Sequence, residues 1–358
     1  MTRVRTSRDS PTRSSVRPMV DGEAEPGSGR GRLEDRGHQG PADAFRARHG
    51  SDYHHPVMVE EVVKILEPAG EGEILDGTVG GGGHAEALLS TYPGCRILAV
   101  DRDPEALEEA RGRLAPFGDR VRFLKARFDE AAVGASLAGP VLSGGLLDLG
   151  VSSRQIDRSE RGFAFRTGAP LDMRMEGAEG GGFTAADILN QWEEGKLKEL
   201  FRRIGEEPRA RFIAREVVRR RREIPFRVAD DLLETMEAAF RRPPAIKERA
   251  RVFQALRIQV NDELGALGRA LPALRDALLP GGILVVISYH SLEDRPVKQA
   301  FREWSRSCVC PPEIPVCVCR GEALGETLTR SVVRPTPKEV EGNPRSRSAR
   351  LRAWRKAA

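Results

Sequence analysis

The sequence contains no apolar run long enough to cross a membrane. Its longest, around Ile283–Ile287, falls far short of the ~20 residues that a spanning helix needs. The N-terminus is rich in arginine but has none of the apolar core that a secretory signal carries. We therefore expect a cytoplasmic protein that has no membrane partner.

Cysteine is scarce, and its placement excludes a disulfide framework spread over the chain. Four of the five cysteines fall within Cys308–Cys319. They form two pairs, Cys308-Val-Cys310 and Cys317-Val-Cys319, for which three interpretations remain open: four thiolates on one zinc, reduced thiols in a loop, or a redox pair. Structural zinc sites usually separate paired ligands by about two to four residues, and here one residue intervenes. The sequence therefore assigns no metal ligand.

Lysine is also scarce: the chain has 58 basic residues against 53 acidic ones, and only eight of the basic residues are lysines. The net charge of +5 permits a nucleic-acid partner without requiring one. Two stretches concentrate basic charge. Residues 196–222 hold eleven Lys and Arg against four Glu, and residues 343–358 hold five Arg and one Lys without an acid. Both are predicted to neutralise phosphates, although the first is equally explained as a solvated helix face.

Residues 1–52 lack apolar periodicity and are predicted to be a disordered extension. From residue 53 strands alternate with helices, which indicates an α/β fold with a doubly wound, mostly parallel sheet. The predicted strands are Glu73–Asp76, Arg96–Asp101, Arg120–Leu124, Gly145–Leu149 and Gly281–Ser288.

About 130 residues separate the last two of these strands, too many for one crossover. They are predicted to contain an inserted helical domain at residues 157–250, between two parts of the sheet domain at 53–156 and 251–358. One helix, Leu256–Leu271, is expected to return the chain to the sheet. The helices expected in the insertion begin after Thr184 and then cover Lys196–Ile204, Arg209–Arg222 and Val228–Phe240.

A glycine loop, Asp76–His84, lies between the first strand and its helix. Its four consecutive glycines let a ligand approach the backbone and expose N–H groups at a helix N-terminus. Asp101 ends the next strand, about 20 residues after Gly80, where a carboxylate typically accepts hydrogen bonds from ribose hydroxyls. The two features predict an adenosine-bearing cofactor, but they do not separate a nicotinamide nucleotide from S-adenosylmethionine.

Asp148 ends the fourth predicted strand, at the edge where open α/β sheets bind ligands. It is the candidate catalytic residue, because its carboxylate could face either the cofactor or the amino group of the substrate. The alternative is an Asp that caps the following turn. Aromatic, charged and glycine residues then mix between Asp157 and Met175, a composition suited to a pocket lining.

These motifs together resemble the ribosomal RNA small-subunit methyltransferase H family, also called MraW, over residues 53–358. The resemblance implies a class I S-adenosylmethionine-dependent methyltransferase fold with an inserted helical domain. It also implies methylation of the N4 amino group of a specific cytosine in the decoding region of 16S rRNA, within the 30S subunit, and no action on DNA. The matching stretches are Tyr53–Glu61, Asp76–His84, Ala99–Pro104, Leu147–Ser153, Arg161–Phe165, Leu171–Met175, Phe253–Asn261, Ile287–Arg295 and Asn343–Ser348.

The resemblance also implies roles for single residues. Gly82, Gly83 and His84 are expected at the methionine end of S-adenosyl-L-methionine, and Asp101 at its ribose. Phe128 is expected on the adenine, and Asp148 and Gln155 complete the cofactor shell.

The partner that stacks on the target base is left open. DNA amino-methyltransferases usually carry a Pro-Pro-aromatic motif after the fourth strand, and this chain has Leu149-Gly-Val151 instead. Phe163, Phe165 and Tyr289 are the candidates. Two other functions remain open: a nicotinamide-dependent oxidoreductase on the same fold, and a non-catalytic RNA-binding protein.

Overall fold

The computed structural model describes residues 56–310, 316, 318–319 and 321–358, except for the side chains of Ser153 and Glu179. The segment 1–52, the residues Tyr53–His55 and Cys317 lie outside the described residues. No helix in the described part of the chain combines the length and the apolarity that a membrane crossing requires.

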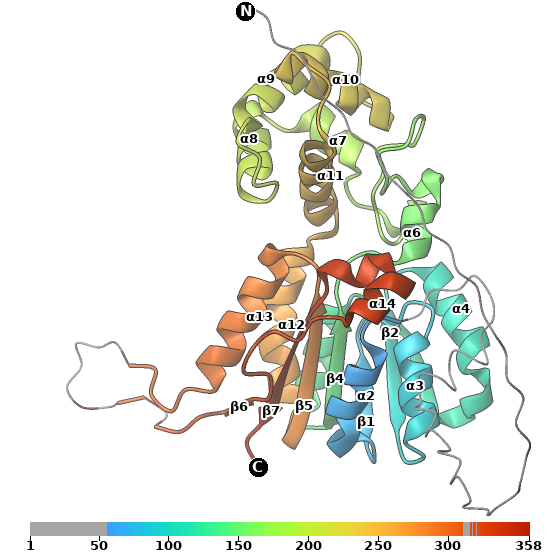
Figure 1. The fold of residues 1–358 in the computed structure, drawn as a ribbon, viewed down its shortest axis with the longest axis vertical. Helices are drawn as coiled ribbons and strands as arrows, with labels where there is room; N and C mark the ends of the chain where they lie inside the picture. The colour runs from blue at the N-terminus through green and yellow to red at the C-terminus, as the bar shows by residue number, and fades with distance from the viewer. Residues whose placement is uncertain (1–55, 311–315, 317, 320) are drawn as a thin grey trace, which may run out of the picture. The chain divides into compact units, whose positions relative to one another are not determined.

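The described strands form one sheet in the order β3-β2-β1-β4-β5-β7-β6 (Figure 1). β1 to β5 are parallel, and β7 runs antiparallel to both β5 and β6. All five predicted strands are confirmed, with small shifts at their ends. The strands are β1 Glu73–Asp76, β2 Arg96–Asp101, β3 Val121–Lys125, β4 Leu142–Asp148, β5 Leu278–Ser288, β6 Gly325–Thr327 and β7 Arg350–Lys356.

Both faces of the sheet are covered by helices. Successive side chains of each strand point to opposite faces, so neighbouring residues enter different apolar clusters. Ile74 belongs to one apolar cluster and the adjacent Leu75 to the other. The first cluster includes residues of α2 Val59–Leu66, α3 Gly83–Thr91 and α4 Pro104–Leu114. The second includes residues of α5 Phe128–Leu137, α12 Glu263–Ala277 and α13 Ser291–Trp304.

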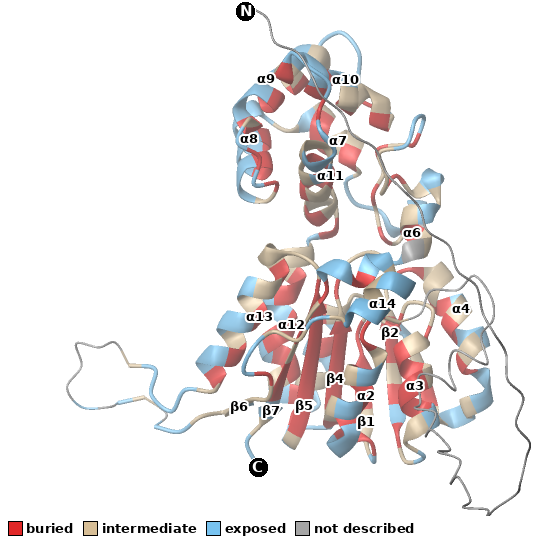
Figure 2. Cartoon of the chain, in the orientation of Figure 1, coloured by how far each residue is buried: buried red, intermediate tan, exposed pale blue. Residues whose placement is uncertain are grey.

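A third apolar cluster is built almost entirely from helices, as the spacing of apolar residues predicts (Figure 2). Thr184 caps the first of them, and its hydroxyl accepts the Asp187 N–H. The expected boundary at residue 250 falls inside α11, whose Val252 and Phe253 pack in this cluster, so the domain limits stay a prediction. These helices are α7 Ala185–Gln191, α8 Glu194–Arg203, α9 Ala210–Arg220, α10 Ala229–Phe240 and α11 Ile246–Asn261.

The prediction of a single helix over Leu256–Leu271 is wrong. The chain leaves α11 at Asn261, and Asp262 adopts a left-handed conformation with φ of 50° before α12 begins. Aspartate tolerates this region better than most residues. The side-chain amide of Asn261 accepts the Met175 N–H at 2.9 Å and donates to the Met173 carbonyl at 2.8 Å. The helix therefore ends where Asn261 can hold the loop of residues 173–175 by hydrogen bonds, and the spacing of apolar residues does not predict this end.

The expectation of an uncompensated basic C-terminal tail is also corrected. Residues Arg350–Lys356 form β7, between β5 and β6. Arg352 donates two hydrogen bonds to the carboxylate of Asp294, at 2.7 and 3.1 Å, and Arg355 pairs with Glu326. Apolar residues alternate with the basic ones in this run, so the charge decorates a strand whose Leu351, Ala353 and Trp354 are buried.

Candidate active site

A cavity of about 860 Å³ opens where β1, β2, β4 and β5 end. Parallel strands present their carboxyl ends at one edge of a sheet, and the loops that follow them line such a crevice. Six of the seven residues predicted to bind the cofactor line it: Gly83, His84, Asp101, Phe128, Asp148 and Gln155.

Gly82, the seventh, is not among the lining residues. It adopts φ of 84° immediately before α3, and its Cα faces Leu114 of α4. Its positive φ turns the chain into the helix, which explains the glycine without a ligand contact. Gly77 is required for a different reason: a Cβ there would lie 2.6 Å from Cδ2 of Leu147.

Asp101 is held in place by the glycine loop itself. Its Oδ2 accepts the Gly80 N–H at 3.0 Å, and its Oδ1 accepts the Asp103 N–H at 2.9 Å. Both oxygens keep a second acceptor site, because a carboxylate oxygen has two lone pairs. Burial raises the pKa of Asp101 to about 6, and the two backbone N–H groups oppose the rise.

Three carboxyl groups converge where the strands end: Asp76 on β1, Asp101 on β2 and Asp148 on β4. Burial raises the pKa of Asp76 to about 7, and the charges of Asp148 and Asp101 add to the rise. Burial likewise raises the pKa of Asp148 to about 7. Buried carboxylates without a matching cation are costly. Asp101 and Asp148 line the cavity, whereas Asp76 lies behind its lining, so the two lining carboxyls are suited to a positively charged ligand.

Asp148 is oriented by two neighbours that the resemblance did not assign to it. The Tyr289 hydroxyl donates a hydrogen bond to Asp148 Oδ1 at 2.8 Å, and Thr78 Oγ1 accepts the Asp148 backbone N–H at 2.7 Å. The hydrogen bond from Tyr289 opposes the rise in the Asp148 pKa that burial causes. Asp148 Oδ2 lies 4.0 Å from Nδ1 of His84.

His84 is neutral at physiological pH, since burial lowers its pKa to about 4. Its Nε2 lies 2.8 Å from the Val57 carbonyl oxygen. A carbonyl can only accept, so Nε2 carries the hydrogen and Nδ1 is left as an acceptor. His84 therefore brings a hydrogen-bond acceptor, not a positive charge, to the cavity.

Gln155 lines the cavity, yet both ends of its amide are occupied. Its Oε1 accepts the Ser152 N–H at 3.0 Å, and its Nε2 donates to Asp103 Oδ2 at 2.9 Å. Asp103 also accepts hydrogen bonds from Glu105 N–H and from Arg161 at 3.0 Å. Asp103, the N-cap of α4, thus joins the start of this helix to the loop after β4.

Aromatic side chains line another part of the cavity. Phe163 and Phe165 both line it, and the Phe165 ring packs edge-to-face on Phe253 of α11, with centroids 5.6 Å apart. Tyr289 lines it too, but its hydroxyl is committed to Asp148. All three aromatic candidates therefore line the cavity, and the choice among them for base stacking stays a prediction.

Guanidinium groups also line the cavity, and four of them are more exposed than its carboxylates. The side chains of Arg154, Arg158, Arg166 and Arg345 are 38–52% exposed, against 21% for Asp148. Each pairs with a carboxylate, such as Arg158 with Glu105 at 2.7 Å and Arg345 with Asp157 at 2.7 Å. The other five arginines of the cavity, Arg102, Arg113, Arg127, Arg161 and Arg257, are only 10–22% exposed and are also paired with carboxylates.

Residues of α11, α12 and α13 also form part of the cavity wall, and sequence patterns did not single them out. Arg257 makes two hydrogen bonds of 2.8 Å to Glu263, and both line the cavity. Glu293 is buried, accepts the Tyr289 N–H at 2.9 Å and lies 3.1 Å from Nε2 of His290. The matching stretches Phe253–Asn261 and Ile287–Arg295 contain most of these residues, but their spacing gave no separate signal.

Comparisons with known proteins identify the family of this chain. The family model described as the MraW methylase family matches residues 51–357. A protein of Gemmatimonas aurantiaca named ribosomal RNA small subunit methyltransferase H is 50% identical over 307 residues, covering 85% of this chain and 96% of that protein. The protein of the same name from Symbiobacterium thermophilum is 47% identical over 310 residues, covering 84% and 96%.

These matches span almost the whole of both proteins, and they include every element that lines the cavity. They exclude the nicotinamide-dependent oxidoreductase. The chain therefore belongs to the MraW methylase family, and it is a methyltransferase with the class I, S-adenosylmethionine-dependent fold.

Proposed function

We propose that this enzyme methylates the N4 amino group of a cytosine in the decoding region of 16S rRNA, in the small ribosomal subunit of the cytoplasm. The relatives named ribosomal RNA small subunit methyltransferase H support the rRNA substrate. The observation that carries the proposal is Asp148, a partly buried carboxylate held by Tyr289 where a cationic methyl donor and an amino group would meet.

The cavity fits S-adenosylmethionine in size and in charge. Its volume of about 860 Å³ lies within the range of small-molecule sites, and its lining offers carboxylates to a cation. When bound, this cofactor supplies a methyl group carried on a positively charged sulfur. Asp101 would accept hydrogen bonds from the ribose hydroxyls, Phe128 would cover the adenine, and Gly83 and His84 would lie beside the methionine part. Gln155 would act by holding the wall through Asp103.

Asp148 would accept a hydrogen bond from the amino group of the target base. An exocyclic amine is a weak nucleophile because its lone pair is delocalised into the ring. A hydrogen bond from its N–H to a carboxylate favours the pyramidal nitrogen on which the lone pair is localised. Tyr289 fixes the carboxylate through Oδ1 and leaves Oδ2 for the amine. Holding the nitrogen in line with the transferred methyl supplies much of the remaining rate enhancement.

The target base must leave its stack to reach this depth. Phe163 and Phe165 offer the aromatic surface for the extruded base. The exposed arginines of the cavity suit the phosphates that flank it. A second cationic surface lies on α8 and α9, where Lys198, Arg202, Arg211 and Arg215 are exposed and make no ion pair within the described part of the chain.

The test uses the purified chain, methyl-labelled S-adenosylmethionine and 30S subunits that lack the modification, followed by digestion of the rRNA to nucleosides. We expect label in N4-methylcytidine and its loss in Asp101→Ala. Label in another nucleoside would refute the cytosine assignment. Cofactor binding without label on any rRNA form would refute the substrate, and absence of cofactor binding would favour a non-catalytic RNA-binding protein.

A further inference from the structure

The segment between α13 and β6 carries the clustered cysteines. Its base is closed by two contacts: the Leu324 N–H donates to the Trp304 carbonyl at 2.8 Å, and the hydroxyls of Ser305 and Thr327 lie 3.0 Å apart. Its described residues form neither helix nor strand.

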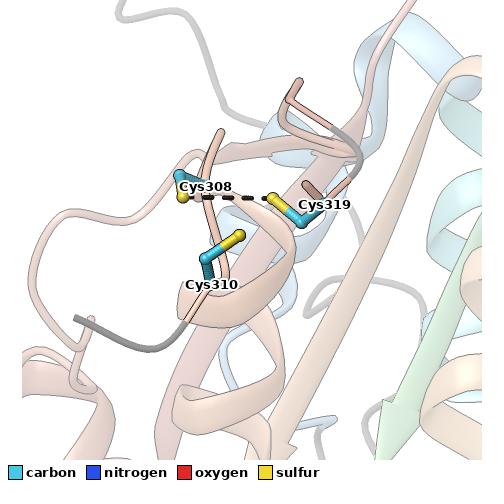
Figure 3. Close-up of side chains that lie close together, drawn as sticks. All are labelled: Cys308, Cys310 and Cys319. Atoms are coloured by element: carbon cyan, nitrogen blue, oxygen red, sulfur yellow. Dashed lines mark hydrogen bonds between the residues drawn. The ribbon is translucent and has the colours of Figure 1, made fainter. Parts of the chain in front are cut away.

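Three cysteine sulfurs of this segment point toward one another (Figure 3). The sulfur atoms of Cys308, Cys310 and Cys319 all lie within 4.8 Å of each other, and those of Cys308 and Cys319 are 3.9 Å apart. A tetrahedral zinc with bonds of about 2.3 Å places its sulfur ligands about 3.8 Å apart. The spacing of these sulfurs therefore matches two thiolates on one zinc.

A backbone group supports one of these sulfurs. The Val309 N–H donates to Sγ of Cys319, with nitrogen and sulfur 3.4 Å apart. A hydrogen bond of this kind stabilises a thiolate and orients it, as the outer contacts of metal sites do. It also crosses from the Cys308–Cys310 arm to the Cys319 arm, so the backbone already holds the two arms in register.

Apolar burial does not explain how the segment is held. Val309 is 37% exposed, Val316 70% and Val318 75%. Ordering each residue costs roughly 1–2 kcal/mol of conformational entropy, and exposed valines return little of it. A metal ion that joins the two arms provides the missing stabilisation.

We propose that Cys308, Cys310 and Cys319 bind one Zn²⁺, with water in the fourth position of its tetrahedron. Their thiolates are soft ligands, which favour zinc over magnesium or calcium. Only one residue separates Cys308 from Cys310, which is unusual for two ligands of one zinc. Here the third ligand, Cys319, comes from the opposite arm of the loop and completes the set. Cys317 lies outside the described residues and is no part of the proposed site.

The test measures zinc in the full chain, purified under reducing conditions without a chelator. We expect about one zinc per chain by elemental mass spectrometry, and less than about a tenth of that in the triple variant Cys308→Ser, Cys310→Ser, Cys319→Ser. The matched control is Cys95→Ala, because Cys95 is buried in the sheet domain and burial raises its pKa to about 11. The control should keep its zinc.

Two further measurements make the test independent of methylation. Co²⁺ added to the zinc-free chain should produce the sulfur-to-metal charge-transfer absorption of a thiolate site, and the triple variant should lack it while still binding S-adenosylmethionine. Zinc removal should also make residues 305–324 more sensitive to protease. A wild-type chain that takes up no Zn²⁺ or Co²⁺, equal zinc in the triple variant, or a stable Cys308–Cys319 disulfide in the purified protein would each overturn the proposal.

Discussion

Asp148 is the residue whose substitution separates chemistry from binding. Asp148→Asn keeps the shape of the side chain and can still receive the hydrogen bond from Tyr289, but it loses the negative charge that accepts from the amine. Positioned proton acceptors contribute about 10²–10⁴-fold to rate. We expect kcat to fall at least about 100-fold while the Kd for S-adenosylmethionine changes only a few-fold, as measured by single-turnover kinetics and calorimetry.

Tyr289→Phe is the companion variant, because it removes only the hydroxyl that orients Asp148. A loss of about tenfold in kcat, smaller than that of Asp148→Asn, would agree with a positioning role. If Asp148→Asn turned over at the wild-type rate, Asp148 would not be the acceptor, and a carbonyl of the following loop would take its place.

The same residue sets the expected pH dependence. Burial raises the pKa of Asp148 to about 7, so the group is protonated at acidic pH and cannot then accept a hydrogen bond from the amine through that oxygen. We expect kcat/KM for the RNA to rise with pH through an apparent pKa at or somewhat below 7, since a bound cation lowers it. The acid limb should disappear in Asp148→Asn. A profile that is flat between about pH 5.5 and 8 in the wild type would contradict this expectation.

At the scale of one element, the glycine loop tests whether the backbone shape sets cofactor affinity. Gly77→Ala would place a Cβ 2.6 Å from Leu147 and 3.0 Å from Phe128, so the loop or these two side chains must shift. We expect affinity for S-adenosylmethionine to fall at least about tenfold by calorimetry. Gly112→Ala in α4 is the matched control, because a Cβ there meets nothing within 4 Å. Equal affinity in both variants would show that the backbone shape of the glycine loop does not set the affinity for the cofactor.

Helices α8 and α9 test where RNA binds outside the cavity. Lys198→Glu combined with Arg202→Glu reverses two exposed charges of α8, and each lost phosphate contact should lower the salt dependence of binding by roughly one unit of slope. We expect weaker binding to 30S subunits and unchanged affinity for S-adenosylmethionine. Lys64→Glu with Arg96→Glu is the control, because Arg96 begins β2 at the sheet edge opposite the cavity. Equal loss in both pairs would indicate a general effect of charge.

Sequence patterns predicted the elements whose signals are local. The five parallel strands, the cap at Thr184 and the cavity position of Asp101 and Asp148 follow from apolar runs, capping residues and strand ends. The break at Asp262 and the burial of β7 depend on partners far away in the sequence, namely Met173 and β5. The hydrogen bond between Tyr289 and Asp148 joins residues 141 positions apart, which no local pattern encodes.

At the scale of the whole molecule, the buried carboxyls couple stability to pH and to the cofactor. Asp76, Asp101 and Asp148 have pKa values raised from 3.8 to between about 6 and about 7. A carboxyl with a raised pKa binds its proton more tightly in the folded chain. Its contribution to stability is therefore complete below about pH 4 and is lost as pH rises toward 7.

His84 acts in the opposite direction, since its pKa is lowered from 6.5 to about 4, and its stabilising contribution is lost as pH falls below about 6.5. The effect of the three carboxyls on stability is larger than the opposite effect of His84. The free energy of unfolding of the cofactor-free enzyme should therefore decrease between about pH 4 and 7 as far as these four residues determine it. Above about pH 6.5 His84 is neutral in both states, and the carboxyls alone act. Denaturant unfolding at several pH values measures this trend.

A cationic ligand should reverse that loss, because it pairs with the ionised carboxylates. S-adenosylmethionine carries a positive sulfur that S-adenosylhomocysteine lacks, so their difference in affinity isolates the charge. We expect S-adenosylmethionine to bind more tightly relative to S-adenosylhomocysteine at pH 8 than at pH 5.5, several-fold in the ratio of Kd values, and the pH dependence to shrink in Asp148→Asn. A ratio that stays constant across this range would show that the carboxyls that line the cavity do not recognise the charge. The same binding titrations on Tyr289→Phe should show the dependence displaced to higher pH, because this variant keeps the carboxylate but loses the hydrogen bond that lowers the Asp148 pKa.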